Sequence, residues 1–187
     1  LLKCDYAITT TSALANELKN YVADVYINRN VASEKMLKYS ERAKANVQKE
    51  KDKIILGYFS GSITHNSDFE MILPAIKKVM QENSNVYLKV VGELNMPKEL
   101  DDLKDRIISS PFMEWKKLPE LIASVDINLA PLEDTRFNAA KSENKWVEAS
   151  MVGVPTIASN IGAFAEEIEH GVDGILCANE KEWEEQL

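Results

Sequence analysis

The sequence has few cysteines and no long hydrophobic run. Cys4 and Cys177 are the two cysteines among 187 residues, and their wide separation favours free buried thiols over a disulfide or a catalytic nucleophile. No apolar stretch approaches the roughly 20 residues that a membrane-spanning helix needs, and no signal peptide is recognisable. We therefore expect a cytoplasmic protein.

A surplus of positive charge is also lacking. The 22 lysines and arginines are outnumbered by 30 aspartates and glutamates, which gives a formal net charge of −8. A protein that binds nucleic acid needs a basic face for the phosphates, so we expect no nucleic-acid partner. A small local basic pocket is still compatible with this total.

Glycine-rich cofactor motifs are missing as well. No predicted strand is followed by Gly-x-Gly-x-x-Gly, and the loop after residues 54–61 lacks the Gly-Lys-Ser/Thr of a P-loop. A nicotinamide or flavin cofactor is therefore disfavoured, and we expect no cofactor. What the sequence does contain is 45% hydrophobic and 28% charged residues, the balance of an ordinary soluble globular protein.

The N-terminal part is organised differently from the rest of the chain. A strand, a helix, a strand and a polar helix are predicted there, over residues 4–10, 11–21, 24–27 and 33–50. The charged run Lys-Glu-Lys-Asp-Lys at residues 49–53 is typical of a domain boundary. We expect the end of one domain, a linker helix and a second domain, over residues 1–31, 32–52 and 53–187.

From residue 54 onward, short apolar runs alternate with helix-prone segments. Strands are predicted at residues 54–61, 86–92, 106–110, 126–131, 154–159 and 174–177. Helices are predicted at residues 68–81, 97–104, 118–123, 141–151, 163–170 and 180–187. This alternation predicts an α/β fold in which helices cover both faces of a parallel sheet.

Ligands of an open parallel sheet bind at the carboxyl ends of its strands. The loops predicted at that edge are residues 60–66, 92–95, 109–113 and 131–141. The first loop offers Gly61 for close backbone approach, with Ser62 and His65 beside it. On its own, His65 is more often a loop or helix-start residue than a catalyst. Phe112 in the third loop could stack on a base, and core packing explains it equally well.

The segment KSENKWVEASMVGVPTIAS, residues 141–159, carries the clearest signal. Lys141 and Lys145 lie at the start of a predicted, largely buried helix, where the partial positive charge of the helix end disfavours cations. Glu148 falls on the same stripe at about 100° per residue. A solvated stripe is the alternative, but an anion bound by both lysines and the backbone N–H groups explains the placement directly. With Glu148 facing sugar hydroxyls, the pattern predicts a nucleoside diphosphate.

Three segments resemble a known family. Residues 141–177, KSENKWVEASMVGVPTIASNIGAFAEEIEHGVDGILC, look like the donor-binding signature of GT-B glycosyltransferases, in the group related to bacterial polysaccharide and lipopolysaccharide synthesis. GYFSGSITHNSDF and LPELIASVDINLAPL are similar to the first strand and loop and to a helix–strand unit of the same domain. The resemblance implies a Rossmann-like C-terminal domain that binds a nucleotide-sugar donor, preceded by the end of the acceptor-side domain.

The resemblance also implies roles at matching positions. Glu148 matches the glutamate that holds the ribose hydroxyls. The segment next to the donor diphosphate is matched by Lys141, Ser142 and Lys145, and the loop that faces the phosphates is matched by Gly61 and Ser62.

One position departs from the family pattern. Many retaining members have a further glutamate eight residues before the ribose glutamate, and Ala140 stands there. Asn138 is the candidate stand-in, with His65 and Phe112 as further candidates for contacts to the donor sugar or base. Retaining stereochemistry is therefore not assumed.

The family stabilises the leaving diphosphate with a helix dipole and basic side chains rather than a metal. The sequence agrees, because it has no Asp-x-Asp and no His/Cys cluster with metal-ligand spacing. Lys141 and Lys145 are the candidates for this role, and no general base can be named. The implied acceptor is a polysaccharide or a lipid-linked glycan, with peripheral membrane association of the full-length enzyme. The chain looks truncated, so we expect it to bind donor without transferring sugar.

Two other functions stay open. A nucleotide-sugar 2-epimerase shares the architecture and would also bind the donor, but its chemistry needs carboxylates and histidines, and the sequence has only His65 and His170. A non-catalytic interaction domain is the other alternative, against which the lysines and Glu148 count.

Overall fold

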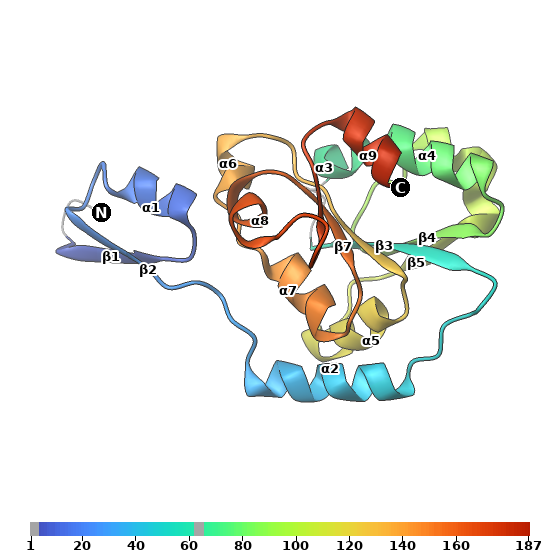
Figure 1. Ribbon diagram of the computed structural model, residues 1–187, viewed down its shortest axis with the longest axis horizontal. Helices are drawn as coiled ribbons and strands as arrows, with labels where there is room; N and C mark the ends of the chain where they lie inside the picture. Colours follow the sequence, from blue (N-terminus) through green and yellow to red (C-terminus); the bar gives the residue numbers. More distant parts are fainter. Residues whose placement is uncertain (1–3, 62–65) are drawn as a thin grey trace.

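The computed structural model describes residues 4–61 and 66–187, and two parts are visible in it. A small N-terminal unit consists of β1 (Tyr6–Thr9), α1 (Ser12–Leu18) and β2 (Asp24–Ile27), whose two strands pair in parallel. A larger α/β unit follows. Figure 1 shows the connecting helix α2 (Glu34–Asn46) running along one side of the larger unit.

One sheet forms the centre of the larger unit. Its strand order is β5-β4-β3-β6-β7-β8, and each neighbouring pair is parallel. The strands are β3 (Ile54–Ser60), β4 (Val86–Gly92), β5 (Ile107–Ser110), β6 (Ile127–Ala130), β7 (Thr156–Ser159) and β8 (Ile175–Cys177). The predicted α/β fold with a parallel sheet is confirmed. After β5 the chain returns to pair β6 with β3, so the order reverses between β3 and β6.

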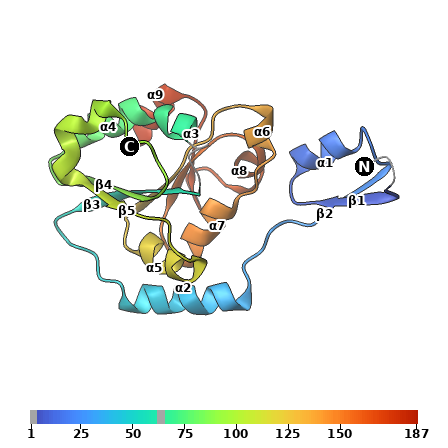
Figure 2. The same ribbon diagram turned by 180° about the vertical axis from the view of Figure 1, so that it is seen from behind.

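Helices cover both faces of this sheet. They are α3 (Asn66–Glu70), α4 (Leu73–Glu82), α5 (Leu118–Ala123), α6 (Arg136–Ala139), α7 (Asn144–Met151), α8 (Gly162–Glu167) and α9 (Glu180–Gln186), with 3₁₀ helices η2 (Lys98–Arg106) and η3 (Trp115–Lys117). In Figures 1 and 2, α3, α4 and α9 lie on one face, whereas α2, α5 and α7 lie on the other. A separate hydrophobic cluster fills each side.

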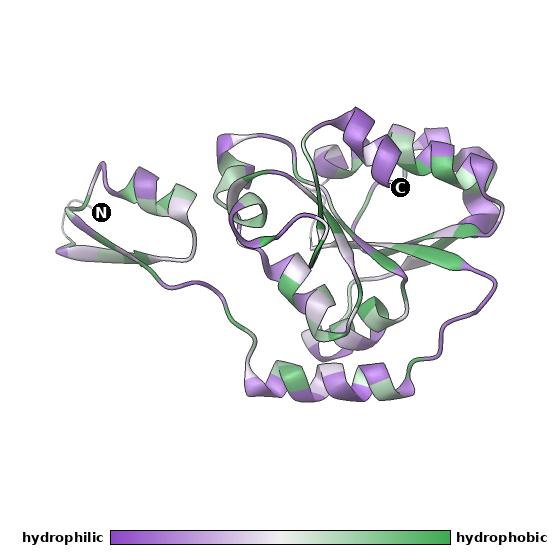
Figure 3. Cartoon of the chain, viewed as in Figure 1, coloured by the Kyte–Doolittle hydropathy of each residue, from purple (hydrophilic) through white to green (hydrophobic). Residues whose placement is uncertain are grey.

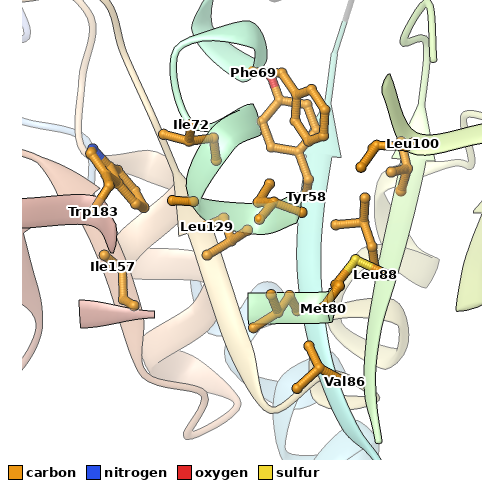
Figure 4. Packing of buried hydrophobic residues seen from close by; sticks show 14 of the residues in the cluster. Tyr58, Phe69, Ile72, Met80, Val86, Leu88, Leu100, Leu129, Ile157 and Trp183 are labelled. Atoms are coloured by element: carbon orange, nitrogen blue, oxygen red, sulfur yellow. The ribbon is translucent and has the colours of Figure 1, made fainter. Parts of the chain in front are cut away.

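The core on the α4 side holds the end of β3 in place. Tyr58 of β3 packs against Phe69 of α3 with ring centroids 4.8 Å apart, and both are fully buried (Figure 4). Leu88 and Met80 continue the same cluster along β4 and α4. Burial of such side chains contributes about 1.5–3 kcal/mol each to folding, so the carboxyl end of β3 is rigidly placed.

Two predicted helices are wrong in detail. Residues 68–81 form two helices, because the ring of Pro74 in a continuous helix would collide with the carbonyl of Glu70. The helix predicted from Lys141 begins instead at Asn144, since the short α6 and the turn after it occupy the preceding residues. Neither α6 nor the break at Pro74 was predicted.

The helix α7 is also less buried than predicted. Ala149 is fully buried, whereas Trp146, Val147 and Met151 are only half-buried. The indole N–H of Trp146 donates to the Asp173 carbonyl, 3.0 Å away. The helix therefore buries only a narrow side against the sheet.

Polar contacts tie the N-terminal unit to the larger one. Arg29 forms an ion pair with Glu166 at 2.6 Å, and the Thr11 hydroxyl donates to the Ala140 carbonyl at 3.0 Å. Arg136 of α6 also pairs with Glu17 of α1. These contacts meet the larger unit on and around α6 and α8, close to the carboxyl edge of the sheet.

Hydropathy follows these layers. Figure 3 shows hydrophobic stretches on the central strands, and hydrophilic and hydrophobic turns alternating along α2. Within residues 4–61 and 66–187, no helix combines the length and the apolar character needed to cross a membrane.

Candidate functional site

A pocket of about 270 Å³ opens at the carboxyl ends of β3 and β4. This is the side of the sheet where ligands of such folds bind, next to the point at which the strand order reverses. Its walls come from β3, β4, the loop after β5, η3, α5 and α7. The lining residues are Phe59, Ser60, Gly61, Val91, Phe112, Met113, Trp115, Leu118, Leu121, Lys145 and Glu148.

Asn128 fixes the start of α7 beside this pocket. Its amide nitrogen donates to the Lys145 carbonyl at 3.2 Å and to the Thr156 hydroxyl at 3.0 Å. Because Asn128 is buried on β6 and Thr156 on β7, these hydrogen bonds attach the first turn of α7 to two strands. Lys145 and Glu148 are thereby held at one wall of the pocket.

Lys145 presents an unusual cation. The residue lines the pocket, and its ammonium nitrogen is buried and has no hydrogen-bond partner among the described residues. The ammonium lies 5.0 Å from the centre of the Tyr58 ring, a cation–π contact. The pKa of Lys145 is lowered from 10.5 to about 8, chiefly by burial; Asp68 and Glu148 oppose the shift, whereas the charge of Lys141 contributes to it. An anion in the pocket would supply the partner that this cation lacks.

Glu148 lies one helical turn beyond Lys145 and lines the same pocket. Burial raises the pKa of its carboxyl group, and the charge of Lys145 opposes that shift. A half-buried carboxylate at a pocket wall is a strong acceptor for hydroxyl groups. The pair thus offers a cation and a hydrogen-bond acceptor side by side.

Lys141 is placed differently from the prediction. It lies before α7, so it does not share a helical stripe with Lys145 and Glu148. Its ammonium is 3.4 Å from a carboxylate oxygen of Asp68 and 5.3 Å from the centre of the Phe137 ring. Glu143 is the N-cap residue of α7, so a negative charge is next to that helix end.

Asp68 organises the corner around Lys141 and was not predicted as a site residue. It is only 1% exposed, and one of its oxygens accepts from the Glu133 backbone N–H at 2.9 Å and from the Asn138 amide at 2.8 Å. Asn138 is buried and also donates to the Glu133 carbonyl at 3.0 Å. We call Asp68, Lys141 and Asn138 the acidic corner.

The other predicted site residues fall in several places. Ser142 lies outside the described lining of the pocket, where its hydroxyl accepts from the Asn30 amide at 3.0 Å. Gly61 lines the pocket, and an added Cβ there would meet no described atom within 4 Å. Phe112 is 67% exposed and lines the pocket, so it does not pack in the core. Ser62 and His65 lie outside the described residues.

The structure thus brings Gly61, Phe112, Lys145 and Glu148 together at one pocket. Its apolar wall was not predicted beyond Phe112. Met113 in the same loop and Trp115 at the start of η3 carried a signal, because both are large apolar or aromatic residues that closely follow a strand. In the part of the chain that the structure describes, no three His, Cys, Asp or Glu side chains gather as a metal-binding group. The arrangement is suited to a ligand with a flat apolar part, hydroxyl groups and negative charge.

Comparison with known proteins identifies the family. The model of the family described as glycosyl transferases group 1 matches residues 54–187. The uncharacterized glycosyltransferase MJ1607 of Methanocaldococcus jannaschii is 28% identical over 130 residues, which are 66% of this chain and 31% of that protein. The chain therefore spans about a third of this curated relative.

Solved structures share the fold at low sequence identity. Anabaena Alr3699/HepE, crystallised with UDP and glucose, has a TM-score of 0.66 and 18% identity, over 97% of this chain and 51% of that one. WaaG, a glycosyltransferase involved in lipopolysaccharide biosynthesis, has a TM-score of 0.68 and 14% identity, over 95% of this chain and 51% of that one. Since the family model covers most of the chain, the protein belongs to the group 1 glycosyl transferases.

Proposed function

We propose that this chain is the donor-binding part of a glycosyltransferase that uses a nucleoside-diphosphate sugar. The observation that supports this most is the ammonium of Lys145, which is buried without a hydrogen-bond partner among the described residues. Burying a charge without a partner is costly. A diphosphate would offset that cost through charge-assisted hydrogen bonds.

The apolar end of the pocket suits a nucleobase. Phe112 and Met113 follow β5 and line the pocket together with Val91 at the end of β4. Flat apolar walls favour a stacked or covered ring. The Anabaena relative was crystallised with UDP, so we propose UDP as the nucleotide of the donor.

The remaining groups follow from the position of the base. We assign Glu148 to the ribose hydroxyls, and Lys145 to the diphosphate. Further candidates for contacts to the diphosphate are Lys141, Ser142, Gly61 and Ser62. His65 and Asn138 are candidates for the donor sugar, although the amide of Asn138 is already engaged in the acidic corner.

The reaction that this site would support is glycosyl transfer. An acceptor hydroxyl oxygen bonds to the anomeric carbon, the bond from that carbon to the diphosphate oxygen breaks, and a general base outside this site takes the hydroxyl proton. Lys145 stabilises the negative charge that develops on the leaving diphosphate. We propose a polysaccharide or lipid-linked glycan as acceptor.

Calorimetric titration with UDP and with uridine tests the proposal. Lys145→Gln should weaken UDP binding about 10- to 100-fold, the effect of losing a hydrogen bond to a charged group. Uridine lacks the diphosphate, so its affinity should be the same for both proteins. Lys181→Gln, which changes an exposed lysine of α9, is the matched control. Absence of UDP binding, or an equal loss for uridine and UDP, would contradict the proposal.

A further inference from the structure

One wall of the pocket comes from Trp115, and the connecting helix holds this residue. Trp115 is the first residue of η3, lines the pocket and is 47% exposed. The Tyr39 ring of α2 meets the indole edge-on, with centroids 5.6 Å apart and an interplanar angle of 87°. Lys35, one turn earlier on α2, places its ammonium 5.4 Å from the centre of the indole. Such contacts fix the orientation of an otherwise mobile exposed side chain.

The same helix also approaches Glu148. Met36 of α2 shares a small cavity of about 30 Å³ with Trp115 and Glu148. A second cavity, of about 230 Å³, is bounded by Met36, by residues 30–32 and by Glu148. The connecting segment and the first turn of α2 therefore lie beside the carboxylate that we assign to the ribose.

The docking of α2 has a clear basis in its sequence. Ser33 caps the helix by accepting a hydrogen bond from the Met36 N–H. Met36, Tyr39, Ser40 and Ala43 recur at helical spacing and are the side chains withdrawn from solvent. Ala43 belongs to the hydrophobic cluster that also contains Ile122 of α5 and Ala149 of α7. The helix is thus packed on the two helices that flank the pocket.

We propose that the connecting helix α2 is part of the nucleotide site, with Tyr39 as a positioning residue that holds Trp115 in place as a pocket wall. This inference rests on the proposed function. Since coupling between two equilibria is reciprocal, a bound nucleoside diphosphate stabilises the docked position of α2, and docking of α2 increases nucleotide affinity. The segment that joins the two units thereby senses whether the donor is bound.

Titration of this chain with UDP, monitored by tryptophan emission, tests the proposal. Trp146→Phe is used as the background, because it removes the other partly exposed indole while Trp183 stays fully buried. In this background, saturating UDP should change the emission of Trp115. Tyr39→Leu should weaken UDP binding about fivefold and alter that emission change, whereas Tyr39→Phe should preserve both.

Two further measurements keep the test independent of the folding of Tyr39→Leu. Lys35→Ala should weaken UDP binding about twofold, and Lys38→Ala, which removes an exposed lysine of the same helix, should not. Amide hydrogen exchange across Glu34–Asn46 should slow when UDP is present, because the ligand stabilises the docked helix.

The outcomes separate this inference from the proposed function. If the unmodified chain does not bind UDP, the proposed function is wrong. If it binds UDP, but Tyr39→Leu and Lys35→Ala leave affinity and emission unchanged, the role of α2 is overturned and the donor site stands. If UDP binds but amide hydrogen exchange in α2 does not slow, the role of α2 is also overturned, whatever the affinities of the variants.

Discussion

Lys141 and Lys145 lie four residues apart in the sequence, and the fold treats them in opposite ways. Lys141 has a resident counter-ion, the buried Asp68, whose oxygen lies 3.4 Å from the ammonium. Lys145 buries its ammonium against the Tyr58 ring, with no hydrogen-bond partner among residues 4–61 and 66–187. The difference gives Lys141 a structural role in the acidic corner, and it supports the proposed assignment of Lys145 to the diphosphate.

The largest effect is expected from removing the counter-ion. Asp68→Ala should lower the free energy of unfolding by about 3 kcal/mol, because Lys141, the Glu133 N–H and the Asn138 amide each lose an acceptor. Urea denaturation measures this. Asp101→Ala, which removes an exposed ion pair with Lys104, should cost less than about 0.5 kcal/mol. Equal losses for the two variants would show that the acidic corner contributes no more than a surface pair.

Removing the buried cation should have the opposite sign. Lys145→Met replaces an unpartnered ammonium by an apolar group of similar length, so the free energy of unfolding at pH 7 should rise by about 2 kcal/mol. Lys141→Met should lower it, because it leaves Asp68 without its cation. Urea denaturation of both variants in the same buffer measures the two changes in the free energy of unfolding. If both changes have the same sign, the two lysines do not differ in the way described.

The pH dependence sharpens this second prediction. The pKa of Lys145 is 10.5 as a free side chain and about 8 in the fold. Between these values the unfolded chain binds more protons than the folded one, so stability rises with pH there. Below about pH 8 both states are protonated and the folded protein bears the full cost of the buried charge. The advantage of Lys145→Met should therefore shrink as the pH is raised from 8 toward 10.

The smallest effect concerns the affinity for UDP. Lys141→Ala should weaken binding only about threefold, roughly 0.6 kcal/mol, since the ammonium is already engaged by Asp68. Calorimetry on this variant and on Lys145→Gln gives the comparison directly. A loss for Lys141→Ala as large as that for Lys145→Gln would mean that Lys141 leaves Asp68 and binds the diphosphate.

Local sequence patterns predicted the central strands correctly but misplaced two helix boundaries. The apolar runs of β3 and β4 are buried strands because continuous hydrophobic segments need a covered sheet. The helix break before Leu73 was equally local, since Pro74 carries the signal, but the apolar periodicity on both sides obscured it. The start of α7 was misplaced because no proline or glycine marks the turn between α6 and α7.

Features that depend on distant residues were not predictable. Asp68 contacts Lys141 across 73 positions, and no periodicity links residues so far apart. Tyr39 and Trp115 likewise meet only because α2 packs beside η3. Lys145 and Glu148 were found because both belong to one helix, whereas the aromatic wall they face comes from the other half of the sheet.

The position of β3 in the sheet has a consequence for how the protein assembles. This central strand pairs with β4, which follows it closely in the chain, and with β6, which begins only at Ile127. Pairings between distant segments form slowly, because the loop between them must close first. On a growing chain the apolar wall of the pocket would exist before α7 emerges, and Lys145 would be buried among the last side chains. A bound donor should therefore slow the unfolding of the protein and leave its folding rate unchanged, because the contacts with Lys145 form late.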